Sequence, residues 1–440
     1  MRFTRSLAAA AVSSALALSI ASAESSDELA RAAATPVSAT SAADKPVADS
    51  PEDKALEPDQ KGKPLFQYKR SGLHIGQKGK GRFFGKVNIR SQIRFSSPFR
   101  GAPRKPSHFS QADENDLRFQ RARFKMEGHV FKPWIAFKFE DDLVNNRILD
   151  ARMTIKKWGW LQFRFGQAKV DYNRERLDSS GKQQFADRSI VNRAFTLDRQ
   201  KGVTILGRLM KGTLGDSRYY VGAFAGNGRG FRQPKTGPRL NHDDGAPMLM
   251  ARYQWNFLGQ DLGHSQSDLE YHEKPAAALE VGTASNRSRY TRFSSGGGGQ
   301  VDGFELGEPG QYSLRQFMEE SSVKYRGFSL QHELHWKRIK DHVNISTTYM
   351  RGSFVQAGYF FHYLFPRIPK QLEVGARWGF VDPNRDRGND LQKEAALVVN
   401  WFFYGHGNKL TFDTSRYSLG QINEPDLNDT QVRLQWDVSF

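Results

Sequence analysis

The sequence has 440 residues, no cysteine and a net charge of +18, and hydrophobic residues make up 38% of it. The absence of cysteine excludes disulfides, thiolate metal sites and cysteine nucleophiles. The large positive charge indicates anionic partners.

Residues 1–23 have the pattern of a secretory signal peptide. A short basic head precedes a stretch of small apolar residues, and Ala21-Ser22-Ala23 then forms an A-x-A cleavage site. The apolar stretch is too short to span a membrane. We therefore expect export, with cleavage before Glu24. Because an exported protein rarely meets nucleic acid, the expected anionic partners are small solutes and lipopolysaccharide.

Residues 24–63 are rich in Ala, Pro, Ser, Asp and Lys and contain no aromatic residue. Such a composition cannot bury enough apolar surface to fold. We expect a disordered periplasmic extension over residues 24–80, followed by a folded domain over residues 81–440. The signal segment contributes a charge of +2 and residues 24–63 contribute −4, which leaves +20 on residues 64–440.

From residue 81 onward the sequence alternates with a period of two. Residues 86–95 place Val87, Ile89, Ile93 and Phe95 on one face and Lys86, Arg90 and Arg94 on the other. Successive side chains of a strand point to opposite faces, so one face is apolar and the other cationic. The last residues, 432–440, repeat this alternation.

About sixteen such strands are predicted, an even number that is typical of a closed antiparallel transmembrane β-barrel. Short and long connections alternate between them, except that connection 258–276 is long and connection 142–147 is short. The predicted strands cover 86–95, 117–128, 134–141, 148–156, 160–167, 202–209, 218–225, 248–257, 277–283, 315–325, 328–338, 352–363, 371–381, 392–402, 408–414 and 432–440.

Energetic cost decides which face of such a barrel meets lipid. An Arg or Lys at the bilayer midplane costs roughly 2–4 kcal/mol, so the cationic face must line the lumen. Aromatic residues near the predicted periplasmic ends fit an interfacial girdle. These are Trp134, Trp158, Trp160, Trp401 and Trp436. The alternative is a soluble β-domain with the tryptophans in its core.

Several collinear segments match a known family. They are Phe119-Gln120-Arg121-Ala122-Arg123-Phe124, Phe165-Gly166-Gln167 with Lys169, Arg188-Ser189-Ile190-Val191-Asn192-Arg193-Ala194-Phe195, Gly358-Tyr359-Phe360, Glu373-Val374 with Arg377, and Asn400-Trp401-Phe402-Phe403-Tyr404-Gly405-His406-Gly407-Asn408-Lys409-Leu410. On these segments the chain resembles the phosphate-selective porin O and P family over residues 83–440. The resemblance implies a sixteen-stranded outer-membrane barrel, usually a homotrimer, that passes anions. The family's arginine ladder and lysine cluster are not placed residue by residue, so phosphate specificity is not carried over.

The inward positions of the first five strands carry ten basic residues against three acidic ones, Glu127, Glu140 and Asp150. Arginine suits an anion path because its planar fork binds oxyanions in a bidentate manner. The alternative is an ordinary lumen whose charges are paired. The candidate anion path consists of Lys86, Arg90, Arg94, Arg121, Arg123, Lys125, Arg152, Lys156 and Arg164, with Lys138 beside them.

Connection 168–201 follows the fifth strand, where sixteen-stranded porins typically fold a loop inward to narrow the channel. We expect Arg174 and Arg188 of this loop to face the pore, while mixed charges around them form internal salt bridges. The later strands place basic and acidic residues inward in similar numbers, which predicts a nearly neutral far wall. These residues are Lys337, Arg377, Lys409, Arg433, Glu333, Glu373, Glu394, Asp413 and Asp437.

The sequence therefore predicts a porin for passive diffusion of small solutes, with a preference for anions. Phosphate and polyphosphate are candidate solutes, and the sequence leaves open which anion passes. A non-conducting structural or adhesive barrel, or a barrel enzyme, is the alternative. We expect no metal or cofactor, since His332 and His335 fall on opposite faces of one strand and no G-x-S-x-G or H-E-x-x-H motif occurs. Phe440 resembles the terminal signal that the barrel-assembly machinery reads. Further expected partners are outer-membrane lipids.

Overall fold

The computed structural model describes residues 66–69, 72–76, 83–98, 101–109, 115–228, 246–294, 297–421 and 423–440. All of them belong to one compact unit, residues 55–440. The expected signal peptide and most of the expected extension lie outside the described residues. Within the described part of the chain, no helix is both long and apolar enough to cross a membrane.

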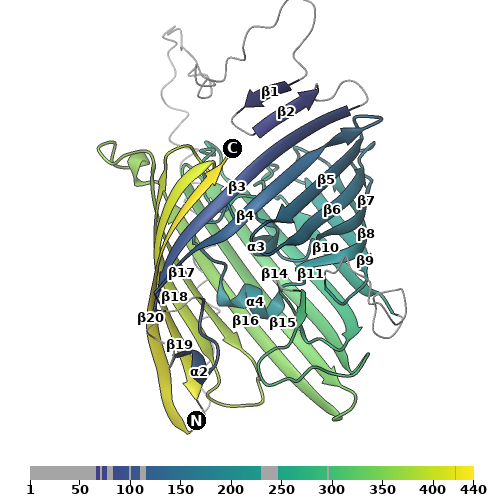
Figure 1. The fold of residues 1–440 in the computed structure, drawn as a ribbon, viewed down its shortest axis with the longest axis vertical. Helices are drawn as coiled ribbons and strands as arrows, with labels where there is room; N and C mark the ends of the chain where they lie inside the picture. Colours follow the sequence, from purple (N-terminus) through teal and green to yellow (C-terminus); the bar gives the residue numbers. More distant parts are fainter. Residues whose placement is uncertain are drawn as a thin grey trace, which may run out of the picture. The chain divides into compact units, whose positions relative to one another are not determined.

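The main sheet is antiparallel and closes into a barrel of sixteen strands, which confirms the predicted fold (Figure 1). Each barrel strand pairs with its neighbours along the chain, and the first pairs with the last. The strands are β3 (Phe83–Ser97), β4 (Asp116–Val130), β5 (Ile135–Asp142), β6 (Arg147–Ile155), β7 (Gln162–Lys169), β8 (Arg199–Leu209), β9 (Ser217–Phe224), β10 (Met248–Trp255), β11 (Ala276–Ser288), β14 (Tyr312–Tyr325), β15 (Phe328–Asp341), β16 (Ser346–Tyr359), β17 (Leu372–Asp382), β18 (Gln392–Phe402), β19 (Asn408–Gln421) and β20 (Glu424–Ser439).

The barrel closes where β20 meets β3. Phe440 and Ile89 exchange both backbone hydrogen bonds, at 2.8 and 2.9 Å. Beyond this point the same edge of β3 pairs with a hairpin made of β1 (Phe66–Lys69) and β2 (Gly72–Gly76). The prediction that residues 24–80 are a disordered extension is therefore wrong at its end, because Phe66–Gly76 forms strands that belong to the main sheet.

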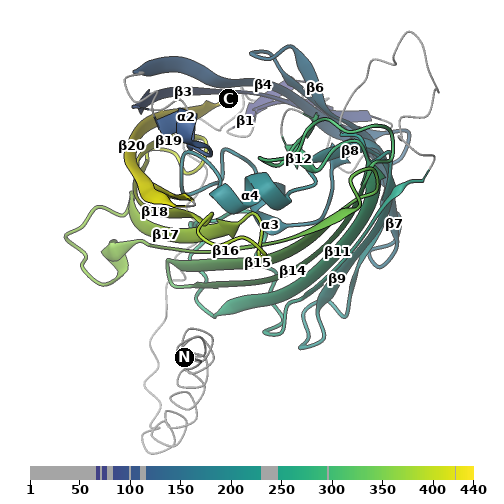
Figure 2. The same ribbon diagram turned by 90° about the horizontal axis from the view of Figure 1, so that it is seen from below.

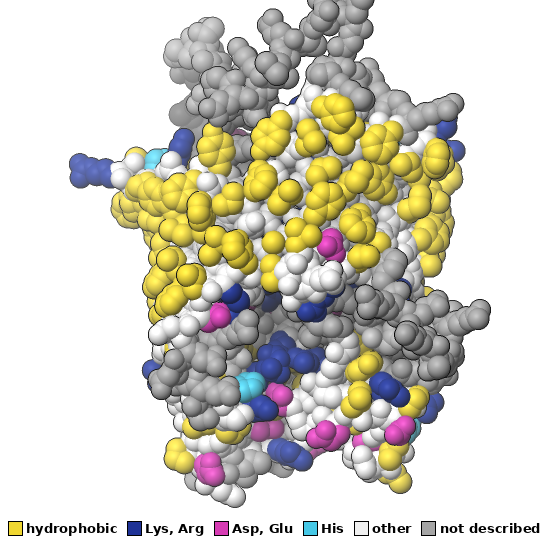
Figure 3. Space-filling model, viewed as in Figure 1, with side chains coloured by type: hydrophobic (Ala, Val, Ile, Leu, Met, Phe, Trp, Pro, Cys, Tyr) yellow, Lys and Arg dark blue, Asp and Glu magenta, His cyan; other side chains and the backbone are white. Residues whose placement is uncertain are grey.

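The outer surface carries the apolar positions of the strands. Large exposed side chains include Leu397 at 60% exposure and Trp436 at 47%. Figure 3 shows hydrophobic side chains gathered in a broad band across one face of the barrel. Such a band is what the hydrocarbon layer of a membrane requires of a barrel. The alternation read from the sequence therefore assigns the lipid face and the lumen correctly, apart from the start of β4, where the register shifts.

Connections at one end of the barrel are short, such as 326–327 between β14 and β15, which marks that end as periplasmic. Connection 256–275 is the long exception predicted at this end, and connection 360–371 is a second one that the sequence did not indicate. The segment between β7 and β8 carries the helices α3 (Arg174–Leu177) and α4 (Ile190–Phe195), which lie inside the ring of strands (Figure 2). The remaining short elements are α2 (Pro106–Phe109), η3 (Phe361–Tyr363), β12 (Arg292–Ser294) and β13 (Gly297–Gly299).

Candidate functional site

Residues 170–198, here called the inserted loop, fill one side of the lumen. Ser189 begins α4 by accepting a hydrogen bond from the Asn192 backbone N–H at 3.3 Å. Glu175 in turn accepts from the Ser189 backbone N–H at 2.6 Å and from its hydroxyl at 2.8 Å. These contacts fold the loop back on itself, which a short capped helix alone would not do.

Carboxylates of the far wall, defined as strands β10, β11 and β14–β20, hold the backbone of the inserted loop. Glu320 accepts from the Arg174 N–H at 2.9 Å, and Glu333 accepts from the Glu175 N–H at 2.7 Å. Asp413 accepts from the Ala186 N–H at 2.8 Å. Because buried backbone groups need partners, these acidic side chains replace the hydrogen bonds that a sheet or helix would supply.

Basic side chains of the far wall hold the loop's carbonyl groups in the same way. Lys409 donates to the Gln183 carbonyl at 2.6 Å, and Arg377 donates to the Asp187 carbonyl at 3.0 Å. Lys337 donates to the Ala194 carbonyl at 3.1 Å. The far-wall charges that the sequence indicated are thus largely engaged with the inserted loop and with one another.

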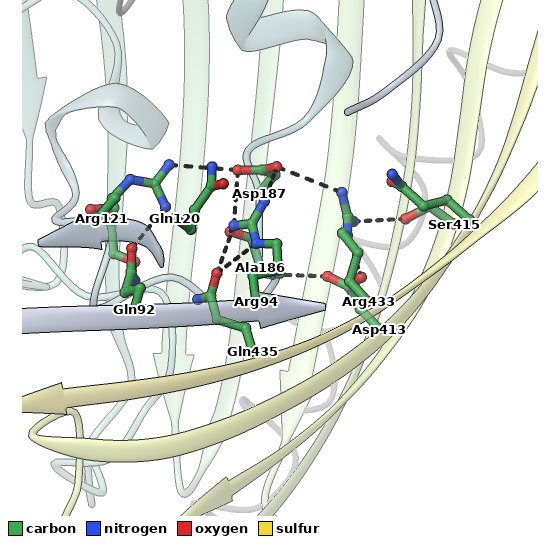
Figure 4. A network of polar contacts seen from close by, with 12 residues as sticks. Gln92, Arg94, Gln120, Arg121, Ala186, Asp187, Asp413, Ser415, Arg433 and Gln435 are labelled. Atoms are coloured by element: carbon green, nitrogen blue, oxygen red, sulfur yellow. Dashed lines mark hydrogen bonds and ion pairs between the residues drawn. The ribbon is translucent and has the colours of Figure 1, made fainter. Parts of the chain in front are cut away.

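Asp187 lies at the centre of a cluster of arginines from the seam of the barrel (Figure 4). Arg94 donates to it at 2.5 Å, and the guanidinium groups of Arg121 and Arg433 lie 3.6 and 3.8 Å away. Burial opposes the ionisation of Asp187, but these three charges outweigh it and hold the pKa of its carboxyl below the usual range. Arg433 also pairs with Asp413 at 2.6 Å.

Arg90 and Arg94 of β3 hold the inserted loop. The Arg90 side chain donates to the hydroxyls of Ser179 and Ser180 at 3.1 and 2.5 Å, and Arg94 donates to the Ala186 carbonyl at 2.6 Å. Both arginines are almost fully buried, so the prediction that they belong to the anion path is wrong. The loop is therefore fixed mainly to β3 and to the far wall. It touches strands β4–β7 at fewer points, through Arg121 of β4 and through Arg164 and Lys169 of β7. We call these four strands the basic wall.

Most predicted cations of the lumen have an acidic partner. Arg123 lies 2.8 Å from Glu140, Arg164 lies 2.6 Å from Asp171, and Lys86 lies 3.3 Å from Glu127. Lys138 pairs with Asp150 at 2.7 Å. These four pairs keep part of each basic side chain exposed, between 12% for Arg123 and 27% for Lys86.

Lys125 and Arg152 differ from their neighbours. Both are partly exposed and face the lumen, and neither forms an ion pair with any described residue. Lys125 lies opposite Glu140 in the register of β4 and β5, and Arg152 lies opposite Lys138 in that of β5 and β6. Lys156 lies just beyond β6, exposed in the turn to β7.

The two loop arginines expected to face the pore have different surroundings. The Arg174 side chain is 3% exposed, lies 3.3 Å from Glu280 and donates to the Gly263 carbonyl, so the expectation that it faces the pore is wrong. Arg188 donates to the carbonyls of Glu175 and Asp178 at 2.7 and 2.8 Å. Arg188 nevertheless keeps part of its surface on the cavity described next.

A cavity of about 940 Å³ lies between the inserted loop, β4 and the loops at the external end of the barrel. Nine arginines and two aspartates, Asp142 and Asp187, line it. The sequence reasoning singled out three of these arginines: Arg121, Arg123 and Arg188. It missed the other six, which are Arg104, Arg118, Arg147, Arg176, Arg193 and Arg199. Arg193 forms no ion pair with a described residue.

A model of the family described as phosphate-selective porin O and P matches residues 99–413. The chain belongs to this family. The match confirms the resemblance carried by its motifs. No curated protein is similar enough in sequence to match the chain. Membership in this family, together with the closed barrel, places the protein in the outer membrane.

Solved structures share the fold of this porin. OmpT of Vibrio cholerae is 8% identical, with a TM-score of 0.50 over 82% of this chain and 99% of its own. The outer membrane channel DcaP of Acinetobacter baumannii is 13% identical, with a TM-score of 0.50 over 81% of this chain and 97% of its own. The anion-selective porin from Comamonas acidovorans is 7% identical, with a TM-score of 0.50 over 81% and 100%.

Proposed function

We propose that this porin is a passive diffusion channel that prefers anions, and that solutes pass between the inserted loop and the basic wall. The observation that carries the proposal is the cavity lined by nine arginines and only two aspartates. Even after ion pairing, such a lining has a positive potential, which concentrates anions and repels cations.

Beyond this cavity, Lys125 and Arg152 continue the path toward the periplasm. Arg123 and Lys125 are two residues apart on β4, so their side chains point to the same face and their Cα atoms are about 6.6 Å apart. An anion that leaves the cavity therefore finds the next cation before it has lost contact with the previous one. Because neither Lys125 nor Arg152 forms an ion pair with a described residue, their side chains can still contact a solute.

A non-conducting structural barrel is the second candidate. It is favoured by the dense hydrogen bonding of the inserted loop, since Glu320, Glu333 and Asp413 engage its backbone and their side chains are fully buried. The diffusion channel and the structural barrel can be distinguished by whether the purified protein conducts current across a bilayer. A barrel enzyme is not supported by the family or by the fold, and we propose a channel without catalytic activity.

The test is the reversal potential of the purified protein in a planar bilayer under a KCl gradient. We expect stepwise conductance and a potential whose sign reports faster passage of chloride than of potassium. The double variant Lys125→Gln/Arg152→Gln should lower the anion-to-cation permeability ratio by roughly twofold or more. Cation preference in the wild type would refute the path, and absence of conductance would favour the structural barrel.

The matched control is Lys211→Gln/Arg326→Gln. It removes the same charge from exposed periplasmic turns, outside the lumen. We expect its permeability ratio to stay near that of the wild type.

The family description further suggests phosphate as a solute. Phosphate in the bath should then reduce the chloride current of the wild type more than that of the Lys125→Gln/Arg152→Gln variant.

We propose a homotrimer, embedded among outer-membrane lipids and lipopolysaccharide and inserted by the barrel-assembly machinery. Chemical crosslinking in native outer membranes, followed by electrophoresis without boiling, should give a species of three times the monomer mass. A species that stays at the monomer mass at every crosslinker concentration would contradict the trimer.

A further inference from the structure

Residues 256–275, here called the periplasmic insert, form an unusually long connection for the periplasmic end of a barrel. Much of it is inside the molecule. Leu262 is 1% exposed, Gln266 is 6% exposed and Ser267 is 1% exposed. A connection that only joined β10 to β11 would stay at the rim, in water.

The periplasmic insert meets the inserted loop through a reciprocal pair of hydrogen bonds. The Gln266 backbone N–H donates to the Lys182 carbonyl at 3.1 Å, and the Gln266 side-chain oxygen accepts from the Gln184 backbone N–H at 2.9 Å. One residue thus satisfies two backbone groups of the loop, just before the segment that carries Asp187.

Two further contacts join the same segments. Arg174 of the inserted loop donates to the Gly263 carbonyl, and Asp178 lies 3.6 Å from the imidazole of His264. The four contacts spread over residues 174–184 of the loop. The periplasmic insert therefore supports the loop along much of its first half and not at a single point.

The periplasmic insert is itself fixed to the turn between β18 and β19 and to the far wall. Ser265 lies 2.8 Å from His406, and Ser267 donates to Glu373 at 2.9 Å. The second oxygen of Glu373 accepts from the Gln184 side chain at 2.8 Å. Glu373 consequently joins the insert and the loop, so a shift of one is passed to the other.

We propose that the periplasmic insert holds the inserted loop in place and so sets the selectivity of the pore, with Gln266 as the positioning residue. The inference rests on the proposed function, because it takes the ion path to run beside the loop. Residues 182–187 lie between Gln266 and the arginine cluster. If they move, Asp187 withdraws from Arg94 and Arg121, and the positive charge on the path increases.

The test compares Gln266→Met with Gln371→Met. Methionine keeps the length of glutamine but cannot accept the Gln184 N–H. Leaving this buried N–H without a partner should raise the population of displaced loop by roughly tenfold. We expect stronger open-channel current noise and a higher anion-to-cation permeability ratio. Gln371 lies in the turn 360–371 at the same end of the barrel, and its side chain forms no hydrogen bond with a described residue, so its variant should match the wild type.

A purely stabilising role would lower the temperature at which the barrel unfolds in SDS and leave noise and selectivity unchanged. That result in the Gln266→Met protein would overturn the proposal. If this variant does not assemble, the pair Asp178→Cys/His264→Cys replaces it, because it joins the loop to the periplasmic insert and leaves Gln266 in place, and the chain has no cysteine of its own. A disulfide should reduce the noise below that of the same protein treated with reductant, and equal noise in both states would overturn the proposal. A wild-type channel that prefers cations would refute the proposed function, while the noise comparison would still test the periplasmic insert.

Discussion

Arg94 of the first barrel strand donates to Asp187 of the inserted loop at 2.5 Å, and this contact fixes the loop next to the seam of the barrel. The Arg94 side chain is fully buried, whereas that of Asp187 is 30% exposed. A buried cation is costly without a partner, so the carboxylate is needed for structure. It also lowers the positive charge on the cavity that it lines.

Asp187→Asn should therefore increase anion preference. The amide keeps an oxygen for Arg94 but removes the negative charge that faces Arg94, Arg121 and Arg433. We expect the reversal potential under a KCl gradient to move further toward the chloride value. Because the pKa of Asp187 is held below its usual range, the carboxyl stays ionised as the pH falls from 7 to 5. The difference between the two proteins should hold over this interval.

The control is Asp386→Asn, in an exposed loop between β17 and β18. It removes one carboxylate without touching the arginine cluster and should leave the reversal potential unchanged. Equal shifts in both variants would mean that selectivity follows net charge alone, and that Asp187 has no special position on the path.

Glu333→Ala should loosen the inserted loop and destabilise the barrel. Glu333 accepts from the Glu175 backbone at 2.7 Å and from the Asn173 side chain at 3.1 Å. Each buried donor left without a partner costs about 1–3 kcal/mol. The temperature of the mobility change in SDS should fall clearly below that of Glu308→Ala, a variant in an exposed loop. Unchanged mobility would show that water replaces the carboxylate at no cost.

The barrel itself was predictable because its strands obey one simple rule. Each strand has water or protein on one side and lipid on the other, so polarity alternates along it. The rule located all sixteen barrel strands, although several predicted strands are shorter than the observed ones. It could not find the hairpin of β1 and β2, because Phe66–Lys69 and Gly72–Gly76 are too short to show a period.

The site was less predictable, and Arg118 shows why. The pairing of β3 with β4 shifts its register between Gln92 and Ile93, so that Gln120 of β4 has no partner on β3. Arg118 therefore faces the same side of the sheet as Arg121. Strict alternation from Arg121 would have placed Arg118 in lipid. The prediction that Arg174 faces the pore was wrong for another reason. Its role depends on Glu280 and Gly263, about a hundred residues away in sequence, and no local pattern encodes such a contact.

Deleting Phe440 should lower the amount of folded protein in the outer membrane. Its backbone makes both closing hydrogen bonds with Ile89, and its side chain is 47% exposed on the outer surface. Phe440→Ala keeps the two backbone bonds and removes only the ring. If the ring is an assembly signal, both variants should lose yield, whereas loss in the deletion alone would assign the effect to barrel closure. Equal yield of all three proteins would remove Phe440 from both roles.

The salt concentration should control how strongly Lys125 and Arg152 affect selectivity. If Lys125 and Arg152 act on solutes by charge, their effect must depend on screening, because the Debye length grows from about 10 Å at 0.1 M to about 30 Å at 0.01 M. We expect the difference in permeability ratio between the wild type and Lys125→Gln/Arg152→Gln to be larger in dilute KCl and to shrink toward 1 M. The rim control Lys211→Gln/Arg326→Gln should follow the wild type at every concentration. A difference that stays constant with salt would show that the substitutions change the shape of the path and not its potential, and the anion path would then have to be sought among the cavity arginines alone.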